Sequence, residues 1–253
     1  MCIINFQFHD HEQYKLVVAA NRDEFYGRPT APAHFWEDEP DILAGRDLLQ
    51  MGTWLGITKQ GRFAAITNYR DGRGEAQGKE SRGAIVRDYL AGDASPKEFL
   101  EFIKEKKNNY NGFNILVGNP NELFYYSNIQ DEMIEIPSGT HSVSNHFLNT
   151  PWPKVMKGKN GLKEYMDQHQ KVDVDDLFTL LLDHEVADDE HLPDTGVGLE
   201  LERQLSPLFI KTPNYGTRSS TVLLIDYHNK VTFVERTYKN GEFADEKQFT
   251  LQV

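Results

Sequence analysis

The sequence predicts an α+β domain, with strands toward both ends of the chain and helices between and after them. Residues 3–8 and 14–20 are apolar, β-prone runs near the N-terminus, and residues 220–227 and 231–238 are similar runs near the C-terminus. Apolar residues at helical spacing occur in the middle of the chain. This order favours a layered α+β domain over a regular βαβ repeat with a parallel sheet.

The strand candidates come in pairs joined by short polar or turn-forming segments, which predicts hairpins and a largely antiparallel sheet. Asn119-Pro120-Asn121 and Asn240-Gly241 are turn sequences, and Asn-Gly is the dipeptide most favoured in a two-residue hairpin turn. The predicted hairpins pair residues 3–8 with 14–20, 53–58 with 63–68, 113–117 with 123–127, and 220–227 with 231–238.

Four helices are expected. Apolar residues at helical spacing follow Ser81-Arg82-Gly83, and a second set follows Ser95-Pro96, a typical helix start. Residues 154–169 and 173–183 are the other two candidates, and the latter carries Leu177, Leu180 and Leu181 at helical spacing. These apolar stripes are interpreted as core.

Length and charge limit the classes of protein to consider. No Pro/Gly/Ser-rich linker divides the 253 residues, so we expect a single domain over residues 1–253. The formal net charge of −12 would repel a phosphate backbone, so nucleic acid is not expected as a partner.

The single cysteine and the pattern of apolar residues predict a cytoplasmic protein. No apolar run reaches the length of a membrane span, and the first residues lack the pattern of a secretory signal. One cysteine cannot form an intramolecular disulfide, which fits a reducing compartment. The sequence does not indicate an oligomeric state.

That cysteine stands at position 2, where it has a specific chemical meaning. Removal of Met1 would expose a residue with both a thiol and a free α-amine, which is the arrangement of an N-terminal nucleophile. The amine titrates near neutral pH and can accept the thiol proton. The alternative is that Cys2 is a small apolar residue that opens a strand.

The segment Asn21-Arg22-Asp23-Glu24 follows the second apolar run and is expected at a strand end near Cys2. An arginine there would favour the thiolate, and a carboxylate would orient the α-amine. The alternative is a surface cluster of salt bridges, which contributes little to stability.

Met1-Cys2, the run from Ala20 to Tyr26, Arg28-Pro29 and Tyr215-Gly216-Thr217-Arg218-Ser219 together resemble the signature of the NRDE-domain proteins, the transport and Golgi organisation family. The similarity extends over nearly the whole chain. That family is in turn remotely similar to choloylglycine hydrolases and penicillin V acylases. The resemblance implies a four-layer αββα sandwich of the N-terminal nucleophile (Ntn) hydrolase type, with Cys2 on a central strand.

The resemblance also implies a set of site residues that converge on one pocket. The catalytic candidates are Cys2, Arg22, Asp23, Asn145 and Arg218, and Asn68 is a substrate-binding candidate. Asn21 and Glu24 of the same segment are further substrate-binding candidates. Trp54 is a candidate as an aromatic residue that could line the pocket, with core packing as its alternative role. Asn68 and Asn145 are candidate oxyanion donors, and Arg218 is expected to hold a substrate carboxylate or to brace the site.

The spacing within this segment leaves alternatives open. Arg22 and Asp23 are adjacent, so they would face opposite sides of a regular strand. Either Glu24 supplies the carboxylate or a bulge intervenes. An alignment on Phe25 instead puts Asn21 where the acylases have their arginine.

Two functions are therefore expected from the sequence and the resemblance. The first is an N-terminal-cysteine amidohydrolase or acyltransferase that acts on a linear amide or ester, requires no cofactor, and cleaves carbon–nitrogen bonds other than peptide bonds. The alternative is a non-catalytic carrier or chaperone for haem or another hydrophobic ligand in the same pocket. No metal site is expected, since His184-Glu185 lacks the second histidine of a zinc-binding helix.

Overall fold

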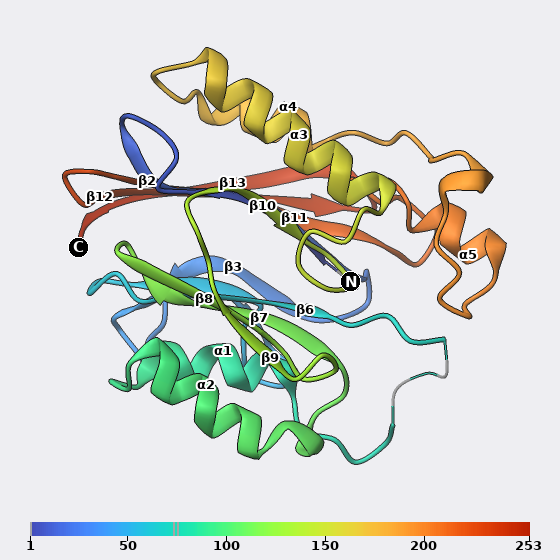
Figure 1. The fold of residues 1–253 in the computed structure, drawn as a ribbon, viewed down its shortest axis with the longest axis horizontal. Coiled ribbons are helices and arrows are strands. Elements are labelled where there is room, and N and C mark those ends of the chain that lie inside the picture. The colour runs from blue at the N-terminus through green and yellow to red at the C-terminus, as the bar shows by residue number, and fades with distance from the viewer. Residues whose placement is uncertain (1, 73, 75) are drawn as a thin grey trace.

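The computed structural model describes residues 2–72, 74 and 76–253, and they form four layers. Two antiparallel sheets face each other, and each is covered on its outer side by helices (Figure 1). The predicted αββα sandwich of antiparallel sheets is thus confirmed. Within the described residues, no helix is long and apolar enough to cross a membrane.

The first sheet carries the N-terminal strand in an internal position. Its order is β10-β1-β2-β11-β12-β13, so β1 lies between the edge strand β10 and β2. Cys2 is thus on an internal strand, whereas the central strands of this sheet are β2 and β11 and not β1 as predicted. The strands of this sheet are β1 (Cys2–Phe8), β2 (Tyr14–Phe25), β10 (Gly139–Val143), β11 (Tyr215–Asp226), β12 (Lys230–Lys239) and β13 (Glu242–Gln252).

The second sheet follows the chain order without a crossover. Every neighbouring pair is antiparallel, in the order β3-β4-β5-β6-β7-β8-β9. Its strands are β3 (Thr30–Phe35), β4 (Ile42–Asp47), β5 (Leu55–Thr58), β6 (Phe63–Asn68), β7 (Phe113–Asn119), β8 (Glu122–Ser127) and β9 (Glu132–Glu135).

The helices divide between the two outer layers. α3 and α4 pack on the first sheet, and α1 and α2 pack on the second. Ser95 starts α2 with a capping box, in which its side chain and that of Glu98 each accept from the other's backbone N–H. The helices are α1 (Arg82–Ala91), α2 (Pro96–Glu105), α3 (Pro153–Gln168), α4 (Val174–Leu181) and α5 (Leu199–Gln204), with short 3₁₀ turns η1 (Lys107–Asn109) and η2 (Asp189–His191).

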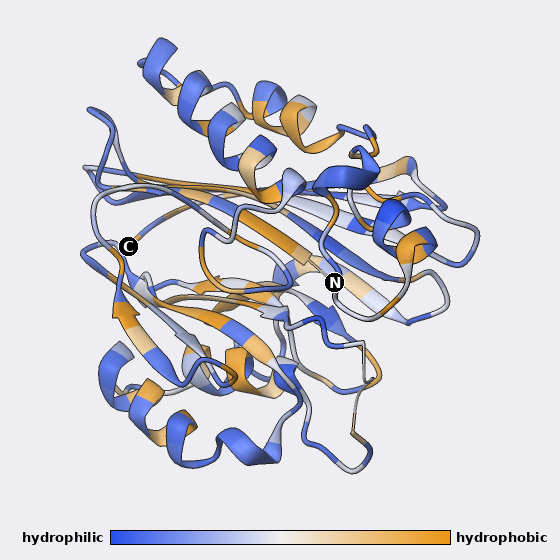
Figure 2. Cartoon of the chain, turned by 45° about the vertical axis from the view of Figure 1, so that its right-hand side comes forward, coloured by the Kyte–Doolittle hydropathy of each residue, from blue (hydrophilic) through white to orange (hydrophobic). Residues whose placement is uncertain are grey.

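The main core lies between the two sheets. Ile4 and Phe6 of β1 pack there with Phe63 and Leu116 of the opposite sheet. Figure 2 shows hydrophobic residues on the strands and hydrophilic residues on the outward sides of the helices. Because successive strand residues alternate between faces, Cys2 shares the inter-sheet face of β1 with Ile4 and Phe6.

The predicted hairpins and helices are present, and the predicted Asn240-Gly241 turn joins β12 to β13 with positive φ at both residues. One boundary matters for the site. β2 continues to Phe25, so Asn21-Arg22-Asp23-Glu24 lies within the strand and not beyond its end. Strands β3, β4, β9 and β10 and helix α5 were not predicted.

Candidate functional site

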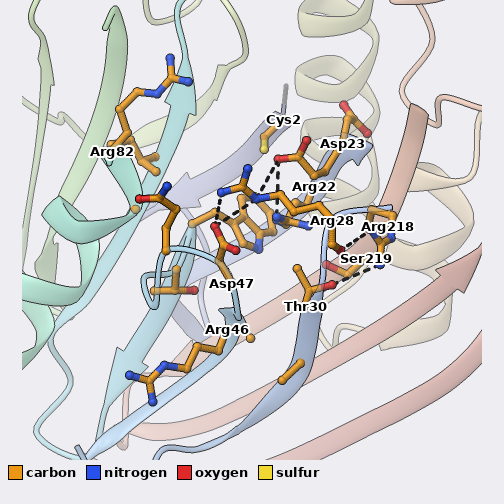
Figure 3. Close-up of a pocket in the computed structure, with 18 of the residues that line it drawn as sticks. Cys2, Arg22, Asp23, Arg28, Thr30, Arg46, Asp47, Arg82, Arg218 and Ser219 are labelled. Atoms are coloured by element: carbon orange, nitrogen blue, oxygen red, sulfur yellow. Dashed lines mark hydrogen bonds and ion pairs between the residues drawn. The ribbon is translucent and has the colours of Figure 1, made fainter. Parts of the chain in front are cut away.

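A cavity of about 460 Å³ opens between the two sheets at the start of β1. Its walls come from β1, β2, β11 and β12 of the first sheet, from β3, β4 and β6 of the second, and from the start of α1. Figure 3 shows Cys2, Arg22, Asp23, Arg28 and Arg218 around this cavity. Of the nine candidate residues, seven line it: Cys2, Arg22, Asp23, Glu24, Trp54, Asn68 and Arg218.

Cys2 is 8% exposed and lines this cavity. Burial raises the pKa of the Cys2 thiol because the thiolate is poorly solvated there. Asp23 raises that pKa further, whereas Arg22 acts in the opposite direction. The thiol therefore needs both a base and a nearby cation to become a nucleophile.

Arg22 is the cation placed to do this. It pairs with Cys2 in the ladder between β1 and β2, and its side chain is 12% exposed. Its one ion pair is long, at 3.7 Å to Glu24, and its guanidinium hydrogen-bonds to no described residue. By contrast, Arg28 bonds to Asp47, and Arg46 makes a bidentate contact with Asp38. Arg22 thus keeps its donors available beside the thiol.

Asp23 is held on the other side of β2 from Arg22, as the alternation of a regular strand requires. Its carboxylate accepts a 2.7 Å hydrogen bond from the Thr217 hydroxyl, and the side chain still reaches the cavity wall. Burial raises the pKa of Asp23, while Lys154, Thr217 and Arg22 oppose that rise. The two neighbouring carboxylates therefore have different partners: Asp23 contacts Thr217, whereas Glu24 pairs with Arg22 and Arg28.

The irregularity that the sequence left open lies on the partner strand. Thr217 pairs with Asp23 and Ser219 pairs with Arg22, so β11 carries one extra residue, Arg218. A bulge of this kind redirects a side chain and increases the local twist. Here the bulged residue is one of the predicted site residues.

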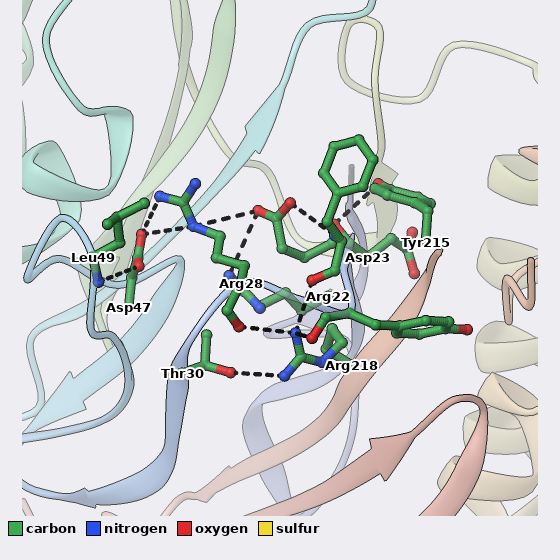
Figure 4. A network of polar contacts seen from close by, with 11 residues as sticks. Arg22, Asp23, Arg28, Thr30, Asp47, Leu49, Tyr215 and Arg218 are labelled. Carbon is green, nitrogen blue, oxygen red and sulfur yellow. Dashed lines mark hydrogen bonds and ion pairs between the residues drawn. The ribbon is translucent and has the colours of Figure 1, made fainter. Parts of the chain in front are cut away.

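Arg218 braces the segment that follows β2. Its guanidinium donates to the carbonyl oxygens of Phe25, Tyr26 and Arg28 at 2.9–3.1 Å, and to the Thr30 hydroxyl at 3.2 Å (Figure 4). Of the two roles expected for Arg218, these contacts correspond to bracing. Four acceptors within the protein leave little donor capacity for a substrate carboxylate.

The two candidate oxyanion donors occupy different environments. Asn68 ends β6 at the cavity wall, and its side-chain amide hydrogen-bonds to no described residue. Asn145 is fully buried and does not line the cavity, which corrects the prediction that it would. The Asn145 Nδ2 donates to the Asn68 carbonyl at 2.9 Å, so this amide supports the wall from behind.

Asn21 also lies away from the cavity, contrary to its prediction as a substrate-binding residue. Its side-chain amide donates to the carbonyl oxygens of Leu181 and Leu208, both at 2.9 Å, and its oxygen accepts from Ser220. These contacts tie β2 to the helical layer. The Asn21 side chain is therefore engaged with the helical layer and β11 and not with the cavity.

Two buried ionisable residues near Cys2 were not predicted. Glu235 of β12 lines the cavity, and burial raises its pKa to about 7. Lys154 of α3 is 3% exposed, and burial lowers its pKa to about 7. Because side chains alternate along a strand, Glu235 lies on the same face of β12 as the core residues Val231 and Phe233. Its inward position could therefore have been predicted from the sequence.

One group of potential metal ligands lies on the surface, away from the cavity. Among the described residues, the ligand atoms of Asp188, Glu190 and His191 lie within 4.8 Å of one another. All three residues are exposed, and none lines the Cys2 cavity. Among the described residues, this cluster is therefore separate from the cavity that contains Cys2.

Comparison with solved structures places the fold. The chain is similar to the Caenorhabditis elegans N-acylethanolamine-hydrolyzing acid amidase ortholog, with a TM-score of 0.53, 11% identity, and coverage of 88% of this chain and 92% of that chain. It is equally similar to the mutant C2A conjugated bile acid hydrolase from Clostridium perfringens, with a TM-score of 0.53, 8% identity and coverage of 97% and 96%. At these identities the likeness shows the Ntn-hydrolase fold alone.

Sequence comparison is more specific. The family model described as "Transport and Golgi organisation 2" matches residues 1–240. The Transport and Golgi organization 2 homolog of Mus musculus is 34% identical, and that of Homo sapiens is 33% identical, each over the full length of both chains. The Drosophila melanogaster protein is 27% identical over 94% of this chain and 92% of its own length. The chain therefore belongs to the Transport and Golgi organisation 2 family.

Proposed function

We propose that this protein is an N-terminal-cysteine amidohydrolase or acyltransferase that acts on a linear amide or ester. The observation that carries the proposal is the position of Cys2: it opens an internal strand, faces a cavity, and lies opposite an arginine whose guanidinium hydrogen-bonds to no described residue. A structural role for a small apolar residue at this position needs neither the cavity nor the arginine.

The chemistry begins with removal of Met1, which lies outside the described residues. The α-amine of Cys2 then takes the thiol proton, and the sulfur attacks the carbonyl carbon of the substrate. When the tetrahedral intermediate collapses, the carbon–nitrogen or carbon–oxygen bond breaks, and the α-ammonium gives its proton to the leaving group. A thioester on Cys2 remains.

Water or an acceptor alcohol or amine completes the cycle. The α-amine takes a proton from the incoming nucleophile as that nucleophile attacks the thioester carbon, and the sulfur leaves and regains the proton. Arg22 stabilises the negative charge on sulfur in both half-reactions. The Asn68 side-chain amide lines the cavity and is the candidate donor to the oxyanion of the tetrahedral intermediate. In other enzymes one such donor lowers the activation barrier by roughly 3 kcal/mol.

One observation favours the alternative of a carrier for haem or an acyl ligand. Burial raises the pKa of the Cys2 thiol, and a neutral thiol suits ligand storage better than attack. The many charged side chains of the wall, however, are unlike the mainly apolar lining that hydrophobic ligands prefer.

The two proposals are separated by substitutions at Cys2. An enzyme loses most turnover of N-acylethanolamines or aryl esters in Cys2→Ser and all of it in Cys2→Ala, while both variants stay folded. A carrier binds haem or a fatty acid almost equally in wild type and Cys2→Ala, as measured by absorbance titration and by ligand-induced thermal shift. Equal ester turnover in wild type and Cys2→Ala would contradict the enzyme proposal.

A further inference from the structure

Lys154 is a buried lysine behind the candidate nucleophile. It is the second residue of α3, which packs on β1 and β10, and its side chain is directed into the protein and not toward solvent. Lysine is almost never fully buried without a partner, because an ammonium loses its hydration there. A buried lysine is therefore expected to have polar partners within the protein.

The direct partner is a neutral amide. Lys154 Nζ donates to Asn145 Oδ1 at 3.3 Å, and no carboxylate of a described residue lies within ion-pair distance. The charged groups around it are Asp23 on β2, Cys2 on β1, Glu202 on α5 and Arg70 after β6. Burial and Arg70 lower the pKa of Lys154 to about 7, whereas Asp23, Cys2 and Glu202 act against that fall.

A chain of hydrogen bonds connects this lysine to Cys2. The Ser144 hydroxyl lies 3.2 Å from Asn145 Oδ1, the atom that also accepts from Lys154, and donates to the Cys2 carbonyl at 2.8 Å. Asn145 in turn donates to the carbonyl of Asn68, a wall residue of the cavity. Lys154 thus contacts Asn145, which connects the start of β1, through Ser144, to that wall, and Arg70 Nη2 donates to the same Asn145 Oδ1 at 3.4 Å.

We infer that Lys154 is a positioning residue for Cys2, which orients Asn145 and Ser144 and places a buried positive charge that favours the Cys2 thiolate. The inference rests on the proposed role of Cys2 as a nucleophile. Lys154 does not touch the reacting atoms, since Asn145 and Ser144 lie between its amine and Cys2.

The charge effect has a defined dependence on pH. Below about pH 7 Lys154 is protonated, and its charge favours the thiolate. As the pH rises through about 7 the lysine loses its proton, and this support disappears. A merely structural lysine would change the reactivity of Cys2 by the same factor at every pH.

Alkylation of Cys2 by iodoacetamide measures this without any substrate, and Cys2 is the only cysteine in the chain. The rate is followed by intact mass between about pH 6 and about pH 9 in wild type, Lys154→Met and Lys154→Gln. The glutamine variant keeps an N–H donor for Asn145 and removes only the charge. Lys157→Met is the control, because Lys157 lies on the same helix but is exposed and pairs with Asp183 and Glu185.

We expect both Lys154 variants to react about tenfold more slowly than wild type near pH 6, which corresponds to one unit of thiol pKa. The rates converge near pH 9, where the wild-type lysine is neutral, and Lys157→Met follows wild type throughout. A constant ratio at every pH, or curves identical to wild type, would overturn the inference.

The shape of each curve gives a second reading beside the ratio of rates. In wild type and in Glu235→Gln the rise of log rate with pH flattens near pH 7 as Lys154 loses its proton, whereas this flattening is reduced in both Lys154 variants. Flattening of equal size in wild type and in the Lys154 variants would belong to the α-amine or to Glu235 and would overturn the inference. The assay is also independent of turnover. If the pH profile of alkylation depends on Lys154 but the protein cleaves no ester, the inference holds and the enzyme proposal fails. If the protein cleaves esters but the Lys154 variants have the wild-type profile, the enzyme proposal holds and the inference fails.

Discussion

Arg22 lies directly opposite Cys2 in the ladder between β1 and β2, and its guanidinium hydrogen-bonds to no described residue. A nearly buried cation with unused donors favours a negative charge beside it, whether on sulfur or on a bound ligand.

The Arg22 position leads to a prediction about thiol reactivity. Arg22→Met should raise the pKa of Cys2 and lower its alkylation rate near neutral pH about tenfold, for a change of about one pKa unit. Arg22→Lys should keep much of the rate. Arg46→Met is the matched control, because Arg46 lines the same cavity but is already paired with Asp38. Equal rates in wild type and Arg22→Met would show that this cation does not act on the thiol.

The bulge at Arg218 leads to a prediction about local stability. Arg218→Ala removes the donor to three backbone carbonyls, so it should destabilise the protein by about 2 kcal/mol. Backbone amides of Tyr26, Gly27, Arg28 and Thr30 should exchange faster, as measured by hydrogen–deuterium exchange, while those of α2 keep their rates. Unchanged exchange in residues 26–30 would refute the bracing role.

The buried pair Arg70–Glu202 should be costly to break from one side. Both side chains are at most 5% exposed, and their N and O atoms lie 2.5 Å apart. Glu202→Gln should destabilise the fold by about 3–5 kcal/mol in urea denaturation, because the buried Arg70 then loses the charge of the Glu202 carboxylate. Replacing both residues by Met and Leu should cost less than this single change. Asp189→Asn, which breaks the exposed pair with Arg203, serves as the control and should have little effect.

Glu235 gives a prediction about the pH dependence of stability. Its pKa rises from 4.5 to about 7 on folding, so the folded state favours the protonated acid. The resulting stabilisation is complete below about pH 4.5 and is lost as the pH rises through about 7, up to about 3 kcal/mol in total. Glu235→Gln should therefore gain stability relative to wild type between about pH 5 and about pH 8 in urea denaturation. Glu101→Gln, on the exposed face of α2, should track wild type, and a Glu235→Gln curve parallel to wild type would contradict the prediction.

The fold could be predicted where the residue pattern is strong. The β1–β2 hairpin and the C-terminal strands have long β-branched runs, so their pairing followed from local sequence. β10 has the sequence Gly-Thr-His-Ser-Val and β9 has four residues, and neither shows a clear alternation. β10 is a strand because its backbone pairs with β1. This pairing is a tertiary effect that the local sequence of β10 does not predict.

The site was predictable to a similar degree. The position of Cys2 and the Asn21-Arg22-Asp23-Glu24 segment identified the cavity. The two segments lie in one hairpin, so the pairing of Cys2 with Arg22 follows from sequence close to both residues. Lys154 could not be found this way. Pro153 is typical of the first position of a helix, but the local sequence does not separate a solvent-facing lysine at the next position from a buried one. The packing of α3 on β1 turns Lys154 inward.

The central claim is that Cys2 is a nucleophile freed by removal of Met1, and intact mass spectrometry tests it most directly. The protein is purified from cells, its N-terminus is determined, and it is incubated with a panel of activated acyl esters before rapid acid quench. The account predicts a chain that begins at Cys2 and gains the mass of one acyl group, with no gain in Cys2→Ala. A chain that keeps Met1 and gains no acyl mass, while it binds haem equally in wild type and Cys2→Ala, would contradict the account.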